Sequence, residues 1–506
     1  MERIKHLLLS GLFLVCSISM SGAIVNGTVK DTSGIPIANA GVSDGRNIVT
    51  TDADGHFTIE TDKANGYLFA ITPSGYEPAT SNVNRPKFWQ LLTAPADTDE
   101  EVNFKLRKID DKRFAFITLA DIQIGNHRND VHVFSTKSVP DINRTIAGLR
   151  QKGLEPIALT LGDQSWDLYW HKNNYALPEA LADLEKIECQ VYNVIGNHDH
   201  NPRVAGDRHS SDTWRKLVGP NYYSFNKGDI HFVILDNVNY INDGATLEKT
   251  GKRNYTDSVS SEQMDWLKQD LALVSHDTPI VIAMHVPLYR DNGRYHLENG
   301  ADLAAMLEQF DDVRVLTGHA HRNSNHNSES GRIKENNYGA VCGTWWWTEL
   351  PDYGNNGVCR DGTPAGYAVW KVDGRNLAGQ YKGTGLPIDY QFRAYDMNTL
   401  PDPEKNGILI NIWGWAPGWK VEVKENGNPL KVEQVTFRDP LYIISGEEPQ
   451  TGQMGKKSLE ALDSSHFFKT KAKKANSKID IKVTDAEGRT YTQHLERPKQ
   501  LAFDMK

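Results

Sequence analysis

The stretch CQVYNVIGNHD, residues 189–199, joins an apolar run to a cluster of side chains that can bind a metal ion. The pattern recurs, because other apolar runs end directly at Asp121, Asp163, His285 and His319. Runs such as PIVIAM, residues 279–284, are apolar at every position, as expected of strands that are covered on both faces. Polar residues at the ends of such strands predict an α/β domain whose site lies beyond the carboxyl ends of its strands.

Helical periodicity fills the gaps between these runs. The helical stretches cover residues 141–153, 178–188, 260–274 and 301–310. The third stretch begins with a capping box, in which Ser260 is followed three positions later by Gln263. We therefore expect strands and helices to alternate through residues 112–374.

Both flanks of this region have β-type patterns. Residues 24–108 alternate short strand-like runs with turn pairs such as Asp54-Gly55, which is typical of a small antiparallel sandwich. Residues 375–506 form a third, β-rich domain. Three tryptophans lie close together in it, namely Trp413, Trp415 and Trp419. We interpret them as core residues, with a platform that stacks sugars or bases as the alternative.

Length and charge limit the classes of function. With 506 residues, of which 39% are hydrophobic and 24% charged, the chain is long enough for about three folded domains. Its formal charge is −9 and it has no basic tract, so it is a poor candidate for nucleic-acid binding through phosphate neutralisation. Thirteen of its 17 histidines lie between Phe114 and His326. The chemistry is therefore expected in the middle of the chain.

Residues 1–23 have the layout of a signal peptide. A short basic segment precedes the apolar run LLLSGLFLVCSISM, which is too short to span a membrane, and Ser21 and Ala23 supply the small residues of a cleavage site. We expect cleavage after Ala23 and export to the periplasm or cell envelope, with no transmembrane segment in the mature chain. A retained membrane anchor and lipoprotein processing at Cys16 are the alternatives.

Three cysteines remain after such cleavage. Cys342 and Cys359 lie in a Gly/Asn-rich region, where they would either form a disulfide in an oxidising compartment or stay free. Cys189 begins an apolar run, so we interpret it as a buried thiol.

The polar residues at the strand ends have the composition of a dinuclear metal centre. They are Asp121, Gln123, Asp163, Asn197, His198, His285, His319 and His321. Carboxylates, imidazoles and amide oxygens together suit manganese, iron or zinc. Asp163 is the natural carboxylate to bridge two ions about 3.5–4 Å apart. The adjacent glycines let the backbone turn sharply off each strand, and we therefore predict two divalent ions.

In chain order the set is D-x-Q, GD, GNHD, H and GHxH, and it resembles the calcineurin-like metallophosphoesterase superfamily over residues 114–374. The segment GTVKDTSGIPIANAGVS, residues 27–43, resembles the carboxypeptidase regulatory-like (transthyretin-like) β-sandwich. The whole layout is similar to that of three-domain exported members of the superfamily. The resemblance implies a four-layer α/β/β/α sandwich with a dinuclear centre, flanked by the two β domains.

The resemblance also implies roles for individual residues. The first metal would take Asp121, Gln123, Asp163 and His321, and the second would take Asp163, Asn197, His285 and His319. His198 would face the phosphate and act as the acid for the leaving group. An acidic residue often supports this histidine from the third position after the GD aspartate. That position holds Trp166 here, so the next residue, Asp167, is the candidate and the pairing is open.

Two departures from the family pattern bear on the substrate and the metal. Gln123 replaces the usual histidine, and a neutral amide oxygen is a weaker ligand, which favours manganese. A similar D-x-Q occurs in the branch that hydrolyses ADP-ribose and CDP-alcohols, which points to diphosphates. Purple acid phosphatases have a metal-binding tyrosine at the position of Trp166, so this residue excludes the purple-type iron chromophore.

A mechanism follows from the charges. Two cations lower the pKa of a bridging water, the resulting hydroxide attacks phosphorus in line, and His198 protonates the departing oxygen. We expect a small phosphodiester or diphosphate as the substrate. A simple phosphomonoesterase and a catalytically weak envelope binding protein are the alternatives.

Five further residues are candidates for substrate contact. Asn126, His127 and His200 lie beside ligands in the sequence, and Trp345 and Trp346 belong to a tryptophan-rich segment after the last ligands. The alternative for the tryptophans is that they anchor their loop to the third domain.

Overall fold

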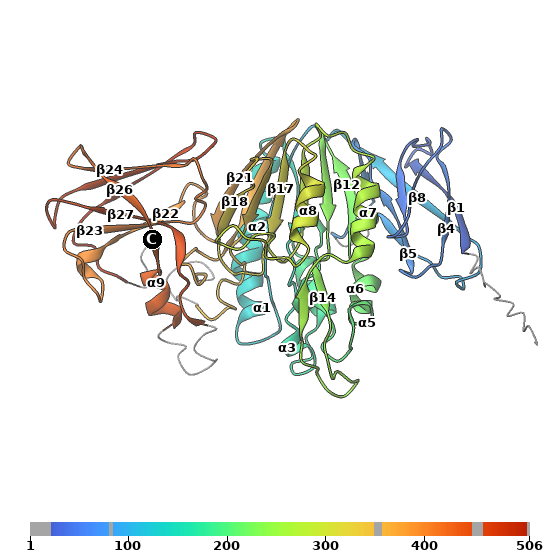
Figure 1. Ribbon diagram of the computed structural model, residues 1–506, viewed down its shortest axis with the longest axis horizontal. Coiled ribbons are helices and arrows are strands. Elements are labelled where there is room, and N and C mark those ends of the chain that lie inside the picture. The colour runs from blue at the N-terminus through green and yellow to red at the C-terminus, as the bar shows by residue number, and fades with distance from the viewer. Residues whose placement is uncertain (1–21, 80–83, 349–356, 448–458, 503–506) are drawn as a thin grey trace, which may run out of the picture.

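The computed structural model describes residues 22–79, 84–348, 357–447 and 459–502, and these form three parts along the long axis of the molecule (Figure 1). The α/β part lies in the middle, and a β part lies at either end. The predicted signal peptide lies almost entirely outside the described residues. Among the described helices, none combines the length and the apolar character needed to cross a membrane.

The N-terminal part is a sandwich of two four-stranded sheets, with strand orders β4-β1-β8-β6 and β3-β2-β5-β7. The strands are β1 Ala23–Asp31, β2 Gly41–Ser43, β3 Ile48–Thr50, β4 His56–Thr61, β5 Tyr67–Ile71, β6 Tyr76–Pro78, β7 Trp89–Leu91 and β8 Glu100–Lys108. Alternate residues of β4, such as Phe57 and Ile59, are buried between the sheets. The predicted sandwich is confirmed, although β1 and β8 pair in parallel rather than antiparallel.

The middle part contains two larger sheets. The first has the order β11-β10-β9-β20-β21, with β9 Arg113–Leu119, β10 Glu155–Thr160, β11 Gln190–Tyr192, β20 Gly366–Asp373 and β21 Asn376–Gly383. The second has the order β12-β13-β16-β17-β19-β18, with β12 Tyr223–Lys227, β13 Ile230–Ile234, β16 Ile280–Ala283, β17 Val313–Thr317, β18 Ser324–Asn327 and β19 Ile333–Asn337. Strands β9–β11 are parallel, as are β13, β16, β17 and β19, so their carboxyl ends share an edge within each sheet.

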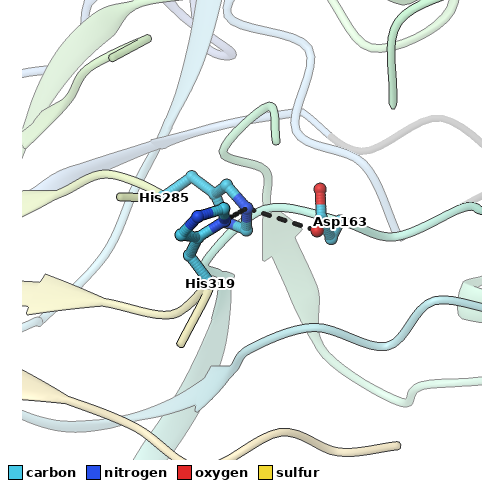
Figure 2. A group of neighbouring side chains, drawn as sticks. All are labelled: Asp163, His285 and His319. Atoms are coloured by element: carbon cyan, nitrogen blue, oxygen red, sulfur yellow. Dashed lines mark hydrogen bonds and ion pairs between the residues drawn. The ribbon is translucent and has the colours of Figure 1, made fainter. Parts of the chain in front are cut away.

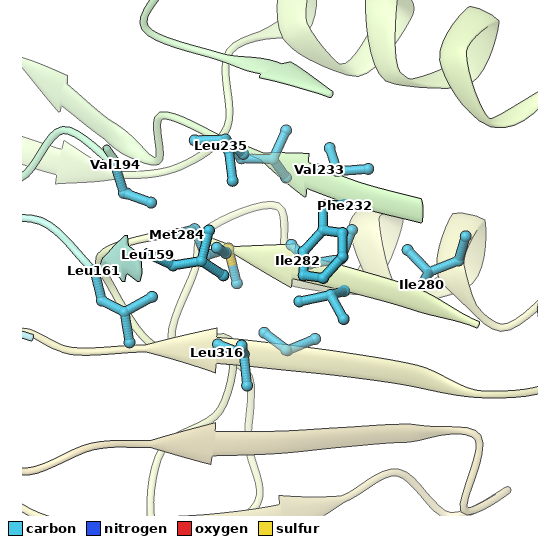
Figure 3. Close-up of a cluster of buried hydrophobic side chains, with 14 of the residues drawn as sticks. Leu159, Leu161, Val194, Phe232, Val233, Leu235, Ile280, Ile282, Met284 and Leu316 are labelled. Carbon is cyan, nitrogen blue, oxygen red and sulfur yellow. The ribbon is translucent and has the colours of Figure 1, made fainter. Parts of the chain in front are cut away.

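One hydrophobic core joins these two sheets face to face. Phe116 of β9 belongs to this core, whereas its neighbour Ile117 belongs to the cluster on the other face of the sheet. Figure 3 shows Leu159 of the first sheet in the same cluster as Phe232 and Ile282 of the second. Because both faces of each sheet are covered at its centre, a central strand such as β16 is apolar and buried at every position.

Four helices form the two outer layers. Side chains of α2 (Val139–Arg150) and α4 (Leu177–Leu184) pack on the first sheet, and those of α7 (Ser261–Leu271) and α8 (Gly300–Leu307) pack on the second. The four-layer α/β/β/α sandwich is confirmed. Each helix ends three or four residues before its predicted end. Shorter elements of this part are α1 Asp130–Val133, α3 Asp167–Trp170, α5 Asp207–Ser210, α6 Asp212–Leu217, β14 Val238–Tyr240 and β15 Tyr255–Asp257.

Only half of the predicted capping box forms at α7. Ser260 Oγ accepts a hydrogen bond from the Gln263 backbone N–H at 3.3 Å. The Gln263 side chain instead pairs with the backbone of Asp236, accepting from its N–H at 3.0 Å and donating to its carbonyl at 2.8 Å. The Gln263 side chain therefore connects the first turn of α7 to the segment that follows β13.

The C-terminal part consists of two more four-stranded sheets, β22-β23-β27-β26 and β25-β24-β28-β29. The strands are β22 Phe392–Asp396, β23 Gly407–Ile412, β24 Lys420–Glu425, β25 Asn428–Leu430, β26 Val432–Phe437, β27 Ser464–Lys471, β28 Ile479–Thr484 and β29 Thr490–Leu495, and α9 spans Pro440–Tyr442. Trp413 is buried, and Trp415 and Trp419 pack partly buried against the core, which favours the core interpretation. Strand β21 still belongs to the first sheet of the middle part, so that sheet extends past the expected boundary at residue 374.

Cys189, Cys342 and Cys359 are buried free thiols in this structure. Cys342 and Cys359 therefore do not form a disulfide with each other in this structure. Burial raises the pKa of all three thiols, which keeps them in the unreactive protonated form.

Candidate metal centre

The residues at the strand ends converge where the two sheets meet, and their backbone is unusual. Five of the seven predicted ligands have φ in the left-handed region: Asp121 (49°), Gln123 (43°), Asp163 (56°), His319 (67°) and His321 (50°). Non-glycine residues rarely adopt this conformation, and residues held in it cluster at functional sites. The sharp turns aim side chains from separate strands at one point.

Glycines beside the ligands are required by close packing. A β-carbon at Gly196 would lie 2.3 Å from Asp163 Oδ1, and one at Gly162 would lie 2.3 Å from His285 Nδ1. A β-carbon at Gly318 would lie 2.6 Å from Asp121 Oδ2. The glycines of the GD, GNH and GH motifs therefore leave the space in which the ligands approach one another.

Asp163, His285 and His319 each place one potential ligand atom within 4.8 Å of the other two (Figure 2). His285 Nε2 lies 3.2 Å from Asp163 Oδ2 and 3.1 Å from His319 Nδ1. The amide oxygen of Asn197 lies 3.0 Å from the same His285 nitrogen. The other oxygen of Asp163, Oδ1, accepts the backbone N–H of His198 at 2.8 Å, which fixes the carboxylate.

Backbone carbonyls set the orientation of two of the histidine rings. His285 Nδ1 lies 2.8 Å from the carbonyl of Leu161, and His321 Nδ1 lies 2.9 Å from that of Gly343, so each Nδ1 donates. Each Nε2 is left for the centre, the usual arrangement of a metal-binding histidine. Around His285 Nε2 lie a carboxylate oxygen of Asp163, the amide oxygen of Asn197 and a ring nitrogen of His319. All of these groups can bind a cation, so a metal ion fits between them.

The pKa shifts of the histidines also indicate a site for a cation. Burial opposes a charge on His285, but Asp163 and Asp121 outweigh it and raise its pKa to about 10, so a proton takes the cation's place when no metal is present. Burial lowers the pKa of His319 to about 3 and that of His321 to about 4. Both are thus neutral, which is the form that binds metals.

Asp121 is the second buried carboxylate. Its Oδ2 accepts the backbone N–H of His319 at 2.8 Å, and its Oδ1 lies 3.4 Å from His321 Nε2. Oδ1 is buried and has no hydrogen-bond partner in the part of the chain that the structure describes. Burial, reinforced by the charge of Asp163, raises the pKa of Asp121 to about 7. An orphaned carboxylate oxygen beside a neutral imidazole fits a metal ion.

Gln123 also lies at the centre. Its Nε2 is 3.2 Å from Asp163 Oδ2, and its Oε1 is 3.6 Å from the sulfur of Cys342. A half-turn of the amide would exchange the two atoms. The position therefore allows either an oxygen ligand or a donor to Asp163, and its role as a ligand stays a prediction.

His198 has the partner that the sequence left open. Its Nδ1 donates to Asp167 Oδ1 at 2.6 Å, and its Nε2 lies 3.9 Å from Asp163 Oδ2. Arg253 forms a two-pronged ion pair with Asp167, with Nη2 2.7 Å from Oδ1 and Nε bonded to Oδ2. Asp167 and Arg253 together orient the ring, so Nε2 faces the pocket.

A pocket of about 270 Å³ opens over the centre. Its lining comprises Gln123, Asp163, Asp167, Asn197, His198, Lys252, Arg253, Tyr255, His319, His321 and Trp345. Lys252, Arg253 and Tyr255 were not predicted. They lie between β14 and β15 or at the start of β15, and their only signal in the sequence is a basic pair in an acidic chain. Buried Asn242 accepts the Arg253 backbone N–H at 2.9 Å and so holds this segment.

The predicted substrate contacts fall into two groups. Trp345 lines the pocket and its ring contacts that of His321 at 4.8 Å. The others do not line it: Asn126 is exposed and His127 stacks on Tyr169. His200 is fully buried, and buried Trp346 donates its indole N–H to the carbonyls of Ile122 and Gln123. The structure thus gives His200 and Trp346 places in the core, because their rings fill space behind the turns that carry the ligands.

Comparison with known proteins gives consistent matches. Three models of the calcineurin-like phosphoesterase match residues 23–109 (N terminal), 120–323 (the phosphoesterase itself) and 335–491 (C terminal). A "probable cyclic nucleotide phosphodiesterase" of Rhodococcus erythropolis is 26% identical over 208 residues, 38% of this chain and 64% of that protein. "Purple acid phosphatase 23" of Arabidopsis thaliana is 31% identical over 154 residues, 27% of this chain and 30% of that protein.

The chain thus spans less than two thirds of the length of these curated relatives. Among solved structures, Plasmodium GAP50 matches with a TM-score of 0.32 and 10% identity, over 54% of this chain and 84% of that one.

The close approach at Gly196 leads to a test. We expect Gly196→Ala to displace Asp163, because the added methyl group would lie 2.3 Å from its carboxylate, and so to abolish stoichiometric divalent-metal binding. Gly148→Ala is the control, since a β-carbon there meets no atom within 4 Å. It lies in α2 and should leave metal binding unchanged while stabilising the fold by up to about 1 kcal/mol. Metal analysis and thermal unfolding measure both effects, and normal metal content in folded Gly196→Ala would contradict the packing argument.

Proposed function

Because the chain belongs to the calcineurin-like phosphoesterase family, we propose that it is a metal-dependent hydrolase of small phosphodiesters or diphosphates. The observation that carries the proposal is the position of buried Asp163 between two sets of ligands, beside the oriented His198–Asp167 pair. Ligands and a candidate acid face the same pocket, which is the arrangement that phosphate-ester hydrolysis requires.

The side chains present fit two ions. Asp121, Gln123, Asp163 and His321 would hold one ion, and Asp163, Asn197, His285 and His319 would hold the other. Bound there, the pair would supply Lewis acidity, activating water and offsetting the negative charge of the phosphate. Manganese is our first choice because of the amide at Gln123, with iron or zinc as the alternatives.

His198 supplies the proton for the leaving oxygen. Asp167 Oδ1 accepts a hydrogen bond from His198 Nδ1 at 2.6 Å, so Nε2 is the atom directed to the substrate. Burial opposes a positive ring, but the charges of Asp163 and Asp167 outweigh it and raise the pKa of His198. A raised pKa favours the protonated ring, whose Nε2 proton can be transferred to the departing oxygen. Asp167 acts through His198 as a positioning residue.

The rim of the pocket favours a substrate with more than a single phosphate group. Lys252, whose Nζ lies 3.7 Å from exposed Asp243, and Arg253, which is paired with Asp167, bring cationic groups beside the centre, and Trp345 offers an aromatic surface. Cations suit a second phosphate and an aromatic face suits a base. The similarity to a protein named as a cyclic nucleotide phosphodiesterase supports the diester class. The similarity to a purple acid phosphatase keeps a simple phosphomonoesterase as the second candidate.

Location and partners remain part of the proposal. The predicted signal peptide supports export to the periplasm or cell envelope, where small phosphate esters would be the partners. Envelope binding without catalysis is the other alternative, and turnover distinguishes it.

The central experiment compares wild type with Asp163→Asn. Wild type should bind two divalent ions per chain and hydrolyse bis-p-nitrophenyl phosphate when manganese is added. Loss of the shared carboxylate should remove both ions and lower turnover at least about 100-fold, because even indirect metal partners contribute 10–100-fold. Asp302→Asn, at an exposed position on α8, is the control and should change neither. Full metal content and activity in Asp163→Asn would contradict the model in which Asp163 is shared by two metal ions.

His198→Ala tests the acid. It should keep both metals and lose about 10²–10⁴-fold in kcat on substrates with alkyl leaving groups, the usual size of general-acid catalysis. The loss should be much smaller for p-nitrophenyl, whose departing oxygen hardly needs a proton. The measurement is kcat across a series of leaving groups. Equal losses across that series would show that His198 does not donate the proton.

Gln123→His tests the metal preference. Imidazole is a better donor than an amide oxygen to zinc and similar ions, so the variant should bind its first metal more tightly and shift in preference from manganese toward zinc or iron. Metal titration into chelator-stripped wild type and variant measures this. Identical affinities and preferences in the two proteins would remove Gln123 from the ligand set.

A further inference from the structure

A second group of potential metal ligands lies outside the pocket. One ring nitrogen of His200 and one carboxylate oxygen each of Asp207 and Asp236 lie within 4.8 Å of one another. The three residues come from separate segments: the turn that carries His198, the first residue of α5, and the residue two positions after β13. None of them belongs to the lining of the 270 Å³ pocket.

His200 has the protonation state of a metal ligand. The Ser210 hydroxyl donates its proton to the carbonyl of Asp207 at 2.9 Å, so His200 Nδ1, 2.9 Å from the same hydroxyl oxygen, must donate to it. The lone pair is therefore on Nε2. This atom is fully buried and has no hydrogen-bond partner among the described residues. An unpaired buried imidazole nitrogen costs free energy unless something occupies its lone pair.

The carboxylates of Asp207 and Asp236 accept hydrogen bonds from neutral donors among the described residues. Asp236 is buried and accepts only neutral donors, Asn221 Nδ2 at 2.9 Å and the Val238 N–H at 3.2 Å. Asp207 accepts the Tyr240 N–H at 2.9 Å. Arg215 is the nearby cation, but its guanidinium pairs with Asp212. One oxygen of Asp207 and one of Asp236 lie within 4.8 Å of each other, so these two carboxylates need a cation or a proton between them.

A fourth polar atom lies beside these groups. The amide of Asn221 that donates to Asp236 has its oxygen, Oδ1, buried and without a hydrogen-bond partner in the described structure. An imidazole, two carboxylates and a spare oxygen are the donor types of a zinc site that is completed by a neutral ligand.

We propose that His200, Asp207 and Asp236 bind a structural zinc ion that is separate from the dinuclear centre. Burial lowers the pKa of His200 to about 3, which keeps the ring neutral as a ligand. Burial raises the pKa of Asp207 to about 6 and that of Asp236 further, so the two carboxylates together need a cation or a proton.

The ion would hold the segments that carry the pocket's acid and its basic rim. His200 lies two residues after His198, and its ring stacks on Tyr240 of β14 with centroids 4.6 Å apart. Asp207 bonds the backbone of the same tyrosine. Strand β14 leads to Arg253, and it lies beside α5 and α6 at the lower edge of the molecule (Figure 1). The site is thus placed to position catalytic side chains from outside the pocket.

The test uses the full chain carrying Asp163→Asn, which weakens the dinuclear centre, and the difference made by His200→Ala in that background reports on the separate site. Chelator-stripped protein is titrated with zinc alone. It should bind one zinc per chain, and adding His200→Ala should lower that affinity at least about 100-fold, as expected when a direct ligand is lost. Adding Asp302→Asn instead should leave zinc binding unchanged, because Asp302 is exposed on α8 and lies outside the cluster.

Zinc anomalous scattering from wild-type crystals locates the ion without any variant. A peak between His200 and Asp236 establishes the site even where His200→Ala fails to fold, and Asp236→Asn is the isosteric second variant. The absence of that peak in zinc-soaked crystals, or unchanged zinc affinity in folded His200→Ala, overturns the proposal and leaves a proton shared by the carboxylates.

Discussion

The structure around the pocket depends on the burial of the Asp163 carboxylate beside side chains that can bind a cation. The carboxylate is almost completely buried, within 3.2 Å of His285 Nε2, and the Asn197 amide oxygen and a ring nitrogen of His319 lie at the same His285 nitrogen. Such a group is stable only around positive charge, since buried charges must be paired or bind metals. The requirement for a cation explains why the ligands come from five strands and why glycines must stand between them.

Another buried carboxylate holds the strained turns in place. Asp199 accepts the backbone N–H groups of Ser165 at 2.9 Å and Gly196 at 3.0 Å, so it ties the GD loop to the GNHD loop. It follows the candidate acid in sequence without facing the pocket. Left-handed residues such as Asp163 persist only where surrounding contacts over-determine them. The sheets beneath and the bonds to Asp199 provide those contacts.

Both flanking β parts form hydrogen bonds or ion pairs with the middle part of the chain. Trp266 of α7 donates its indole N–H to Ser43 Oγ of the N-terminal sandwich at 3.1 Å. On the other side, buried Asp361 accepts the backbone N–H of Asn323, two residues after His321, at 2.8 Å. His466 of the C-terminal part lies 3.2 Å from the same carboxylate. The C-terminal sheets therefore brace the loop that carries the last two ligands, which gives that part a structural role next to the site.

The sequence by itself determined the three-part layout, the alternating α/β middle and the set of candidate ligands, because these depend on local patterns: apolar runs, helical periodicity and the residues that end each strand. It left open whether Asp167 or another residue supports His198, and it placed His200 and Trp346 at the substrate. Only the tertiary structure decided these points and brought Arg253 to the pocket. The reason is that residues next to a ligand in the sequence point in different directions at a sharp turn. Arg253 is separated from Asp167 by 86 positions in the sequence, and a contact over that separation cannot be predicted from a local pattern.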